Sequence, residues 1–295
     1  MSIIQPGERL ASKVTQEHIV PEVYQLFHEN TKLNAYKLKL LQFNLAKHVR
    51  DKDFKVASVN SGKCYPTVER INLDVDDQIE MKLIDAIVSR RSKRNFLNTM
   101  IPFSTLSTII KYSVGITGQT KVENSMLDVR AYPSAGALYP IEVYVVANNV
   151  EYLKKGVYHY NVAENCLEYI LNLSENDLTN KFNIRDQSID CAPITILLTA
   201  MFHRTTYKYG NRGYRFILTE SGHLLQNIAL LSTSYGMGTC DIGGYEDDEI
   251  NEMLGIDGMT ESVIGEVALG LCGDNGNEMP GIYGKGDEDG GFSKS

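Results

Sequence analysis

Residues 90–94 carry the charges that a phosphate group needs. They are Arg90, Arg91, Ser92, Lys93 and Arg94, so four cations and one hydroxyl stand side by side. Cationic side chains hold a phosphate dianion through charge-assisted hydrogen bonds, and a guanidinium can supply two such bonds at once. A solvated basic surface has the same composition. The run therefore indicates phosphate binding but leaves an ordinary exposed surface as the alternative.

Residues 131–140 form a second candidate segment, in which small residues lie between prolines. Such a backbone can lie close against a flat ring, and its amides can bond to the heteroatoms of that ring. The candidate contact residues are Ser134, Ala135, Gly136, Leu138 and Tyr139. An apolar run over 141–147 follows at once, so a tight turn into a strand is the alternative interpretation.

Residues 235–245 form a third, glycine-rich segment. Its glycines can serve as a helix C-cap and a bend. The spacing differs from the G-x-G-x-x-G of a Rossmann dinucleotide site, and no strand is predicted before it. The chain also lacks a G-x-x-x-x-G-K-[ST] phosphate loop. A Rossmann site is therefore not expected.

Hydrophobic periodicity predicts the elements that must position these segments. Helices are expected near 19–27 and over 33–49, 80–90, 103–114, 220–235 and 247–254. A further short helix is expected to begin at Ser174–Asp177. Strands are expected over 141–147, 156–162, 194–200 and 263–271. The helix over 220–235 has the strongest pattern, and Gly236 is placed to end it. Because helices and strands do not alternate regularly, the predicted fold class is α+β.

Composition restricts the classes of function. A net charge of −8 and a pI near 5.3 argue against nucleic-acid binding, which needs a basic surface. The five cysteines are widely spaced, odd in number and without a C-x-x-C pair, so we expect reduced thiols and no metal cluster. No apolar run reaches the roughly 20 residues of a membrane span. The first residues do not resemble a secretory signal, so a cytoplasmic protein is expected.

Taken in order, the three segments resemble the nitroreductase family, whose members bind FMN at the interface of an α+β homodimer. In that family an R-[RH]-S-x-[RK] run holds the phosphate, which assigns this role to Arg90, Arg91, Ser92 and Arg94. A P-S-x-x-N-x-Q-P segment lies along the isoalloxazine ring, and residues 133–140 match its frame. A late G-x-G-T-x-x-I-G-G turn touches the flavin and ends here in Gly243 and Gly244. The resemblance implies FMN as cofactor, a homodimer, and a central, mostly antiparallel sheet flanked by helices.

Two departures from the nitroreductase pattern indicate a branch of the family. Ala137 replaces the asparagine and Tyr139 replaces the glutamine. This version resembles the SagB/McbC-type azoline dehydrogenases of thiazole/oxazole-modified peptide biosynthesis, and residues 27–32 and 207–215 resemble that branch as well. The resemblance implies oxidation of thiazoline and oxazoline rings in a ribosomally made precursor peptide, in a complex with cyclodehydratase subunits.

Lys208 and Tyr209 lie at the position of that branch's catalytic Lys-Tyr pair. Removing a proton and a hydride from an azoline ring needs a base on one side and the flavin on the other. Both side chains normally have a pKa of about 10, so one of them must be shifted to act as a base near neutrality. A neighbouring ammonium favours the phenolate, whereas burial disfavours the charged lysine. Either residue remains a candidate for the base.

Two other functions remain open. One is an NAD(P)H-dependent nitroreductase or flavin reductase acting on small acceptors, and the other is a non-catalytic scaffold subunit of a peptide-modifying complex. The combination of Tyr139 with Lys208 and Tyr209 favours the dehydrogenase over the reductase. A nearby polar group is interpreted as structural, with two of its members sharing a helix face. This group is Arg212, Tyr214, Arg215, Glu220 and His223.

The chain is expected to have three parts. Residues 1–76 would form an N-terminal helical extension, and residues 77–273 would form the FMN-binding domain. The remaining residues, 274–295, are rich in glycine and acidic side chains and have no apolar period, so we expect a disordered tail.

Overall fold

The computed structural model describes residues 22–50, 62–76, 78–122, 125–174, 189 and 191–273. Two predictions lie outside these residues, namely the short helix following Ser174 and the disordered tail over 274–295. The helices of the described part are α2 (Val23–Thr31), α3 (Ala35–Arg50), α5 (Leu83–Ser89), α6 (Phe103–Val114), α8 (Phe202–Tyr209), α9 (Gly213–Ser234) and α10 (Asp247–Leu254).

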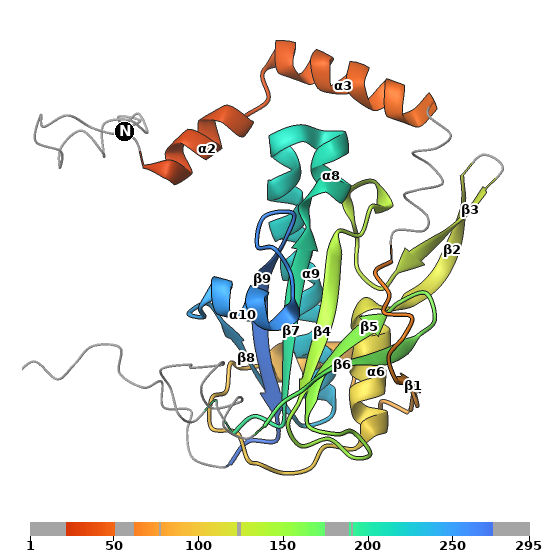
Figure 1. The fold of residues 1–295 in the computed structure, drawn as a ribbon, viewed down its shortest axis with the longest axis vertical. Coiled ribbons are helices and arrows are strands. Elements are labelled where there is room, and N and C mark those ends of the chain that lie inside the picture. The colour runs from red at the N-terminus through yellow and green to blue at the C-terminus, as the bar shows by residue number, and fades with distance from the viewer. Residues whose placement is uncertain are drawn as a thin grey trace, which may run out of the picture.

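A seven-stranded sheet forms the centre of the molecule (Figure 1). In spatial order its strands are β1 (Arg70–Asn72), β6 (Cys166–Asn172), β5 (Gly156–Asn161), β4 (Ile141–Ala147), β7 (Ile194–Met201), β9 (Glu261–Gly270) and β8 (Gly238–Ile242). All neighbouring strands pair antiparallel. A separate hairpin joins β2 (Ile116–Val122) to β3 (Ser125–Arg130). The predicted α+β class with a mostly antiparallel sheet is therefore confirmed.

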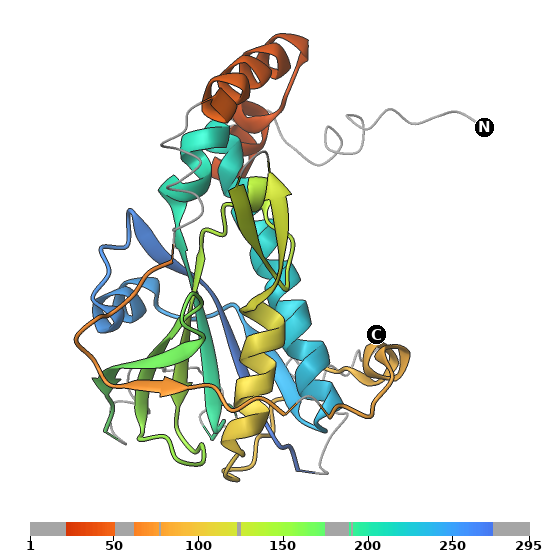
Figure 2. The same ribbon diagram turned by 90° about the vertical axis from the view of Figure 1, so that its right-hand side faces the viewer.

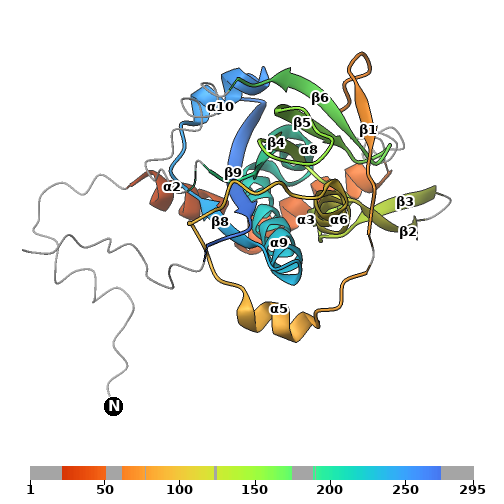
Figure 3. The same cartoon turned by 90° about the horizontal axis from the view of Figure 1, so that it is seen from below.

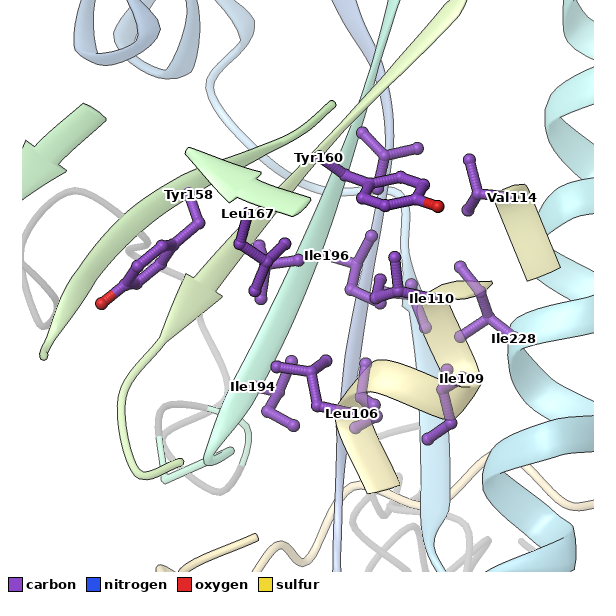
Figure 4. Close-up of a cluster of buried hydrophobic side chains, with 14 of the residues drawn as sticks. Leu106, Ile109, Ile110, Val114, Tyr158, Tyr160, Leu167, Ile194, Ile196 and Ile228 are labelled. Atoms are coloured by element: carbon purple, nitrogen blue, oxygen red, sulfur yellow. The ribbon is translucent and has the colours of Figure 1, made fainter. Parts of the chain in front are cut away.

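Helices cover both faces of this sheet (Figure 3). On one face, apolar side chains of α6 and α9 pack against the central strands to form the main core (Figure 4). Its fully buried members include Leu106, Ile109, Ile110, Ile196 and Ile228. On the other face, Ile250 and Leu254 of α10 pack against a smaller apolar cluster that includes Tyr144 and Leu197. Strand β4 is buried along its whole length, which explains why all its residues except Glu142 are apolar.

Several elements differ from the sequence-based prediction. The glycine-rich segment was predicted to be a turn, but Gly238–Ile242 within it forms β8 and pairs with β9. Helix α9 begins at Gly213 rather than at Glu220. Helix α8, the β2–β3 hairpin, β1 and β6 were not predicted. In β6 the pattern is interrupted by a buried acidic residue, Glu168, whose partners come from other strands.

The first two described helices lie beside α8, at one end of the sheet (Figures 1 and 2). Arg212 Nη1 donates to the carbonyl oxygen of Thr31 at 2.8 Å, and Arg215 Nη2 donates to that of His28 at 2.7 Å. These bonds satisfy carbonyl groups at the end of α2 and fasten it to the start of α9. Both arginines thus have structural contacts, as expected. No helix of the described residues is long and apolar enough to span a bilayer.

Candidate functional site

The segment between the two prolines folds into a tight turn with unusual backbone angles. Gly136, Ala137 and Tyr139 all have positive φ, at 69°, 53° and 43°. Only glycine adopts such angles without steric cost, so Ala137 and Tyr139 hold backbone strain that their surroundings must maintain. Ser134 contributes by accepting a hydrogen bond at its Oγ from the Tyr139 amide, at 2.9 Å. We call residues 134–139 the strained turn.

Lys208 and Tyr209 both reach the strained turn from the end of α8. A Cβ atom built on Gly136 would stand 2.6 Å from Lys208 Nζ and 2.7 Å from Tyr209 OH. The two polar groups therefore meet at the one residue of the turn that has no side chain. Both side chains are half-buried; burial lowers the pKa of Lys208 and raises the pKa of Tyr209. The neutral amine and the neutral phenol are the forms that this environment favours.

A partly buried arginine, Arg204, connects α8 to the strained turn. Arg204 Nη1 donates to the Tyr139 carbonyl at 3.2 Å and lies 2.5 Å from a carboxylate oxygen of Glu142. Arg204 lies four residues before Lys208, so the two side chains leave α8 on the same face, one turn apart. Arg204 thus connects the position of Lys208 to the backbone of the strained turn.

Glu142 belongs to a buried array of charged groups centred on His159. The two ring nitrogens of His159 lie 3.1 Å from Glu142 Oε2 and 2.9 Å from Glu168 Oε2, and all three residues are almost inaccessible to solvent. Each ring nitrogen of His159 thus lies at hydrogen-bond distance from one buried carboxylate. Burial raises the pKa of Glu142, but the hydrogen bond with His159 and the charge of Arg204 outweigh it and bring the pKa to about 2.

Glu220 of α9 is a second buried acid beside the strained turn. Neither of its carboxylate oxygens makes a hydrogen bond of normal geometry. Burial raises the pKa of Glu220 to about 7, although the nearby Ser134 side chain, Arg130 and the Ala135 amide each lower it. The sequence places Glu220 and His223 on one helix face as structural residues, and the structure separates them, because Glu220 is buried and His223 is exposed. The signal was present, since Glu220 keeps helical spacing with the buried Ile217, Leu224 and Ile228.

The raised pKa of Glu220 predicts a stability effect. In the unfolded chain this carboxyl ionises near its ordinary pKa of 4.5, whereas in the folded protein it keeps its proton up to about 7. The folded state therefore binds more protons in this window, and its stability falls as pH rises through it. We expect Glu220→Gln to gain on the order of 3 kcal/mol relative to wild type between about pH 4.5 and pH 7. Urea unfolding at several pH values measures this, with the exposed Glu252→Gln as control. If the difference in unfolding free energy between Glu220→Gln and the wild type stayed the same across that pH window, the raised pKa of Glu220 would be contradicted.

The predicted phosphate-binding run lies elsewhere, between α5 and β8. Ser92 forms an isolated bridge with Thr239, and the Lys93 amide donates to the Thr239 carbonyl at 2.9 Å. No carboxylate oxygen of the described residues lies within ion-pair distance of the Arg90, Arg91 or Arg94 side chains. Burial raises the pKa of Asp241 on β8, and the positive charge of Arg90 lowers it, so Arg90 points toward this strand.

The two predicted glycines lie at the end of β8. Gly243 and Gly244 follow β8 directly, and a Cβ atom on either would meet nothing within 4 Å. The structure therefore divides the predicted site residues into two groups. Ser134, Ala135, Gly136, Tyr139, Lys208 and Tyr209 gather at α8, with Leu138 buried beneath them, whereas the basic run and the two glycines gather at β8. In Figure 2 α8 lies near the top of the molecule and α5, which leads into the basic run, at its lower right.

A pocket of about 320 Å³ opens beside the strained turn. Its walls come from residues 62–64, the β2–β3 hairpin, residues 136–139 and residues 161–164 at the end of β5. The volume is at the lower end of the range for small-molecule sites, enough for one or two amino-acid residues. Gly136 lines the pocket and also faces the Lys208–Tyr209 pair, although neither Lys208 nor Tyr209 lines the pocket itself.

The chain belongs to the nitroreductase family, whose model matches residues 87–271. It is 33% identical over 188 residues to "Putative nitroreductase MJ1384" of Methanocaldococcus jannaschii, a match that covers 64% of this chain and 91% of the relative. The predicted membership of the nitroreductase family and the nitroreductase-like fold are thus confirmed.

Two further comparisons concern the branch. The chain is 32% identical over 136 residues to the microcin B17-processing protein McbC of Escherichia coli, covering 44% of this chain and 50% of McbC. It also shares its fold with a chain in the E. coli microcin synthetase McbBCD complex with truncated pro-MccB17 bound, with a TM-score of 0.54 and 22% identity over 82% of this chain and 99% of that one. These matches confirm the predicted similarity to the SagB/McbC-type proteins.

Proposed function

We propose that the protein is an FMN-dependent azoline dehydrogenase that converts thiazoline and oxazoline rings of a precursor peptide to thiazoles and oxazoles. The observation that carries this proposal is the meeting of Lys208 and Tyr209 at Gly136 of the strained turn. A half-buried amine at this point is a suitable base for ring deprotonation. Similarity to McbC, a protein named for microcin B17 processing, supports a peptide as the substrate.

The residues at β8 fit FMN. Arg90, Arg91 and Arg94 have no carboxylate partner among the described residues, and Ser92 adds a hydroxyl. Arg91 Nη1 donates to the carbonyl oxygens of Val88 and Arg90, both at 2.8 Å, so the other donors of the three side chains are available to a phosphate. The open space above Gly243 and Gly244 would accommodate a flat ring. When bound, FMN supplies the hydride acceptor, and these residues would hold its phosphate and one edge of its ring.

Of the two candidate bases, Lys208 is the better one in this environment. Its pKa is lowered by burial, which increases the fraction of free amine near neutral pH, whereas the same burial raises the pKa of Tyr209 and opposes the phenolate. We assign proton removal to Lys208 Nζ. Tyr209 OH, which faces the same point, would orient the ring as a neutral hydrogen-bond donor.

A homodimer would bring the two groups of site residues together, with the strained turn of one copy facing the basic run of the other. The exposed apolar side chains of α5 support such an interface. They are Leu83, Ile84, Ile87 and Val88, each at least half exposed. A helix with this composition needs a partner surface to bury it.

Replacing Ile84 and Ile87 by glutamate is therefore expected to convert the dimer to monomers and to release FMN, because charges on both residues cannot be buried unpaired. Light scattering coupled to size exclusion, with the flavin absorbance recorded in parallel, measures both effects. Tyr152→Glu, at an exposed aromatic residue away from α5, is the control. A double variant that stays dimeric and yellow would contradict this interface.

Cyclodehydratase subunits are the expected partners, since an azoline must be made before it can be oxidised. The fold match to a chain of the McbBCD complex, solved with a truncated pro-peptide bound, supports an assembly of this kind. Incubating the FMN-loaded protein in air with a synthetic peptide that contains one thiazoline tests the function. Mass spectrometry should find the loss of two hydrogen atoms, and no such loss with either thiazoline or oxazoline would overturn the proposal.

A further inference from the structure

The pocket beside the strained turn contains four charged side chains, three of which already have polar partners. Lys63 Nζ lies 2.7 Å from Glu261, Glu164 lies 2.6 Å from Arg70, and Asp128 accepts a hydrogen bond from Gln119 at 2.8 Å. These three side chains therefore have partners within the protein and give no indication of a ligand.

Arg130 is the fourth, and its guanidinium has donors to spare. Within the described residues no carboxylate oxygen lies at ion-pair distance from it, and its one side-chain hydrogen bond is a long one, 3.4 Å from Nη1 to Tyr132 OH. A guanidinium has five N–H donors, so most of them face the pocket or its solvent. The side chain is only partly exposed, which makes leaving those donors without a partner costly.

The position of Arg130 is fixed rather than free. Its guanidinium carbon lies 4.8 Å from the centre of the Tyr139 ring, a cation–π distance, and its own backbone amide donates to Tyr139 OH at 3.0 Å. The guanidinium thus lies against Tyr139, which also lines the pocket, and a guanidinium can offer two parallel N–H bonds to a planar anion.

We propose that this pocket is a carboxylate-binding subsite, in which Arg130 anchors a carboxylate of the peptide residue next to the ring that is oxidised. The inference rests on the proposed function for the identity of the peptide, but the carboxylate itself follows from the pocket and Arg130. The volume of about 320 Å³ admits a single acidic residue. Its carboxylate could come from an acidic side chain or from the end of a peptide chain, because both present the same planar group.

Three short peptides that carry a finished thiazole separate these sources without any turnover. One has aspartate beside the thiazole and an amidated end, one has asparagine and an amidated end, and one has asparagine and a free carboxyl end. Isothermal titration against the FMN-loaded protein should show about 10-fold to 100-fold tighter binding of the peptide or peptides with a carboxylate. In Arg130→Met this preference should disappear while the bound FMN is retained, and Arg130→Lys should restore part of it.

Arg70→Met is the matched control, since Arg70 is paired with Glu164, a residue of the pocket wall, and does not itself line the pocket. It should keep the preference. Equal binding of all three peptides by the wild type, a preference that survives in Arg130→Met, or loss of FMN from that variant would each overturn the proposal. A preference seen in a protein that fails to oxidise azolines would instead contradict only the proposed function.

Discussion

Lys208→Ala is expected to lower the rate of azoline oxidation by about 10²-fold to 10⁴-fold, because the variant loses the general base. Lys208 is not among the residues assigned to the phosphate or to the ring edge of FMN, so the variant should still bind FMN. Single-turnover oxidation of a thiazoline peptide, followed by mass spectrometry, measures the rate. Full activity in both Lys208→Ala and Tyr209→Phe would end the proposed role of this pair.

The pH profile separates the two side chains. With Lys208 as base, kcat/KM should rise with pH up to a pKa below the ordinary 10.5 of lysine. Tyr209→Phe should keep this ascending limb and lose only about tenfold in rate, which is the effect of one hydrogen bond. A profile that loses its ascending limb in Tyr209→Phe would instead identify the phenolate as the base.

Glu142→Gln is expected to lower the free energy of unfolding by about 3–5 kcal/mol, because it removes the buried carboxylate that pairs with the partly buried Arg204 and with His159. Loss of the Glu142 carboxylate should also reduce turnover, since its partner Arg204 bonds to the Tyr139 carbonyl and lies one helical turn before Lys208. Urea unfolding near neutral pH measures the stability.

Glu164→Gln is the control for that experiment. Glu164 is about half exposed and pairs with Arg70 on the surface, where such a pair contributes about 1 kcal/mol or less. If the two variants were equally stable, the buried array would not have the structural role assigned to it. Because the pKa of Glu142 is low, its contribution should persist down to about pH 4.5 and be lost between there and about pH 2.

The apolar core of this fold was predictable from local patterns. The bounds of α6, α10 and β4 coincide with the predicted ranges, because each is an apolar run or stripe with clear ends. Elements that depend on distant partners were missed. Strand β8 lies among the glycines of the third segment and forms because β9 supplies its hydrogen-bonding partner strand. Strand β6 contains Glu168, whose burial depends on partners such as His159, the residue opposite it on β5.

The candidate site shows the same division. A family resemblance identified the strained turn and the Lys208–Tyr209 pair. No local sequence pattern predicted their contact, since the helix over residues 202–209 was not predicted. Arg204, Glu142 and Glu220 carry no motif, and their roles depend on burial and on contacts between residues far apart in the chain. Of these three residues, only the burial of Glu220 is indicated by the sequence, because Glu220 occupies a position in the spacing of a buried apolar stripe.

The proposed function requires this protein to move electrons from an azoline ring to FMN. Anaerobic mixing of the FMN-loaded protein with a stoichiometric thiazoline peptide tests it most directly, with NAD(P)H in a parallel cuvette. If the protein is an azoline dehydrogenase, the peptide should bleach the oxidised-flavin absorbance and become the thiazole, with one ring oxidised for each FMN reduced. Bleaching by NAD(P)H but not by the peptide would contradict it and identify a reductase of small acceptors, and a protein that binds no flavin would contradict it in favour of a scaffold.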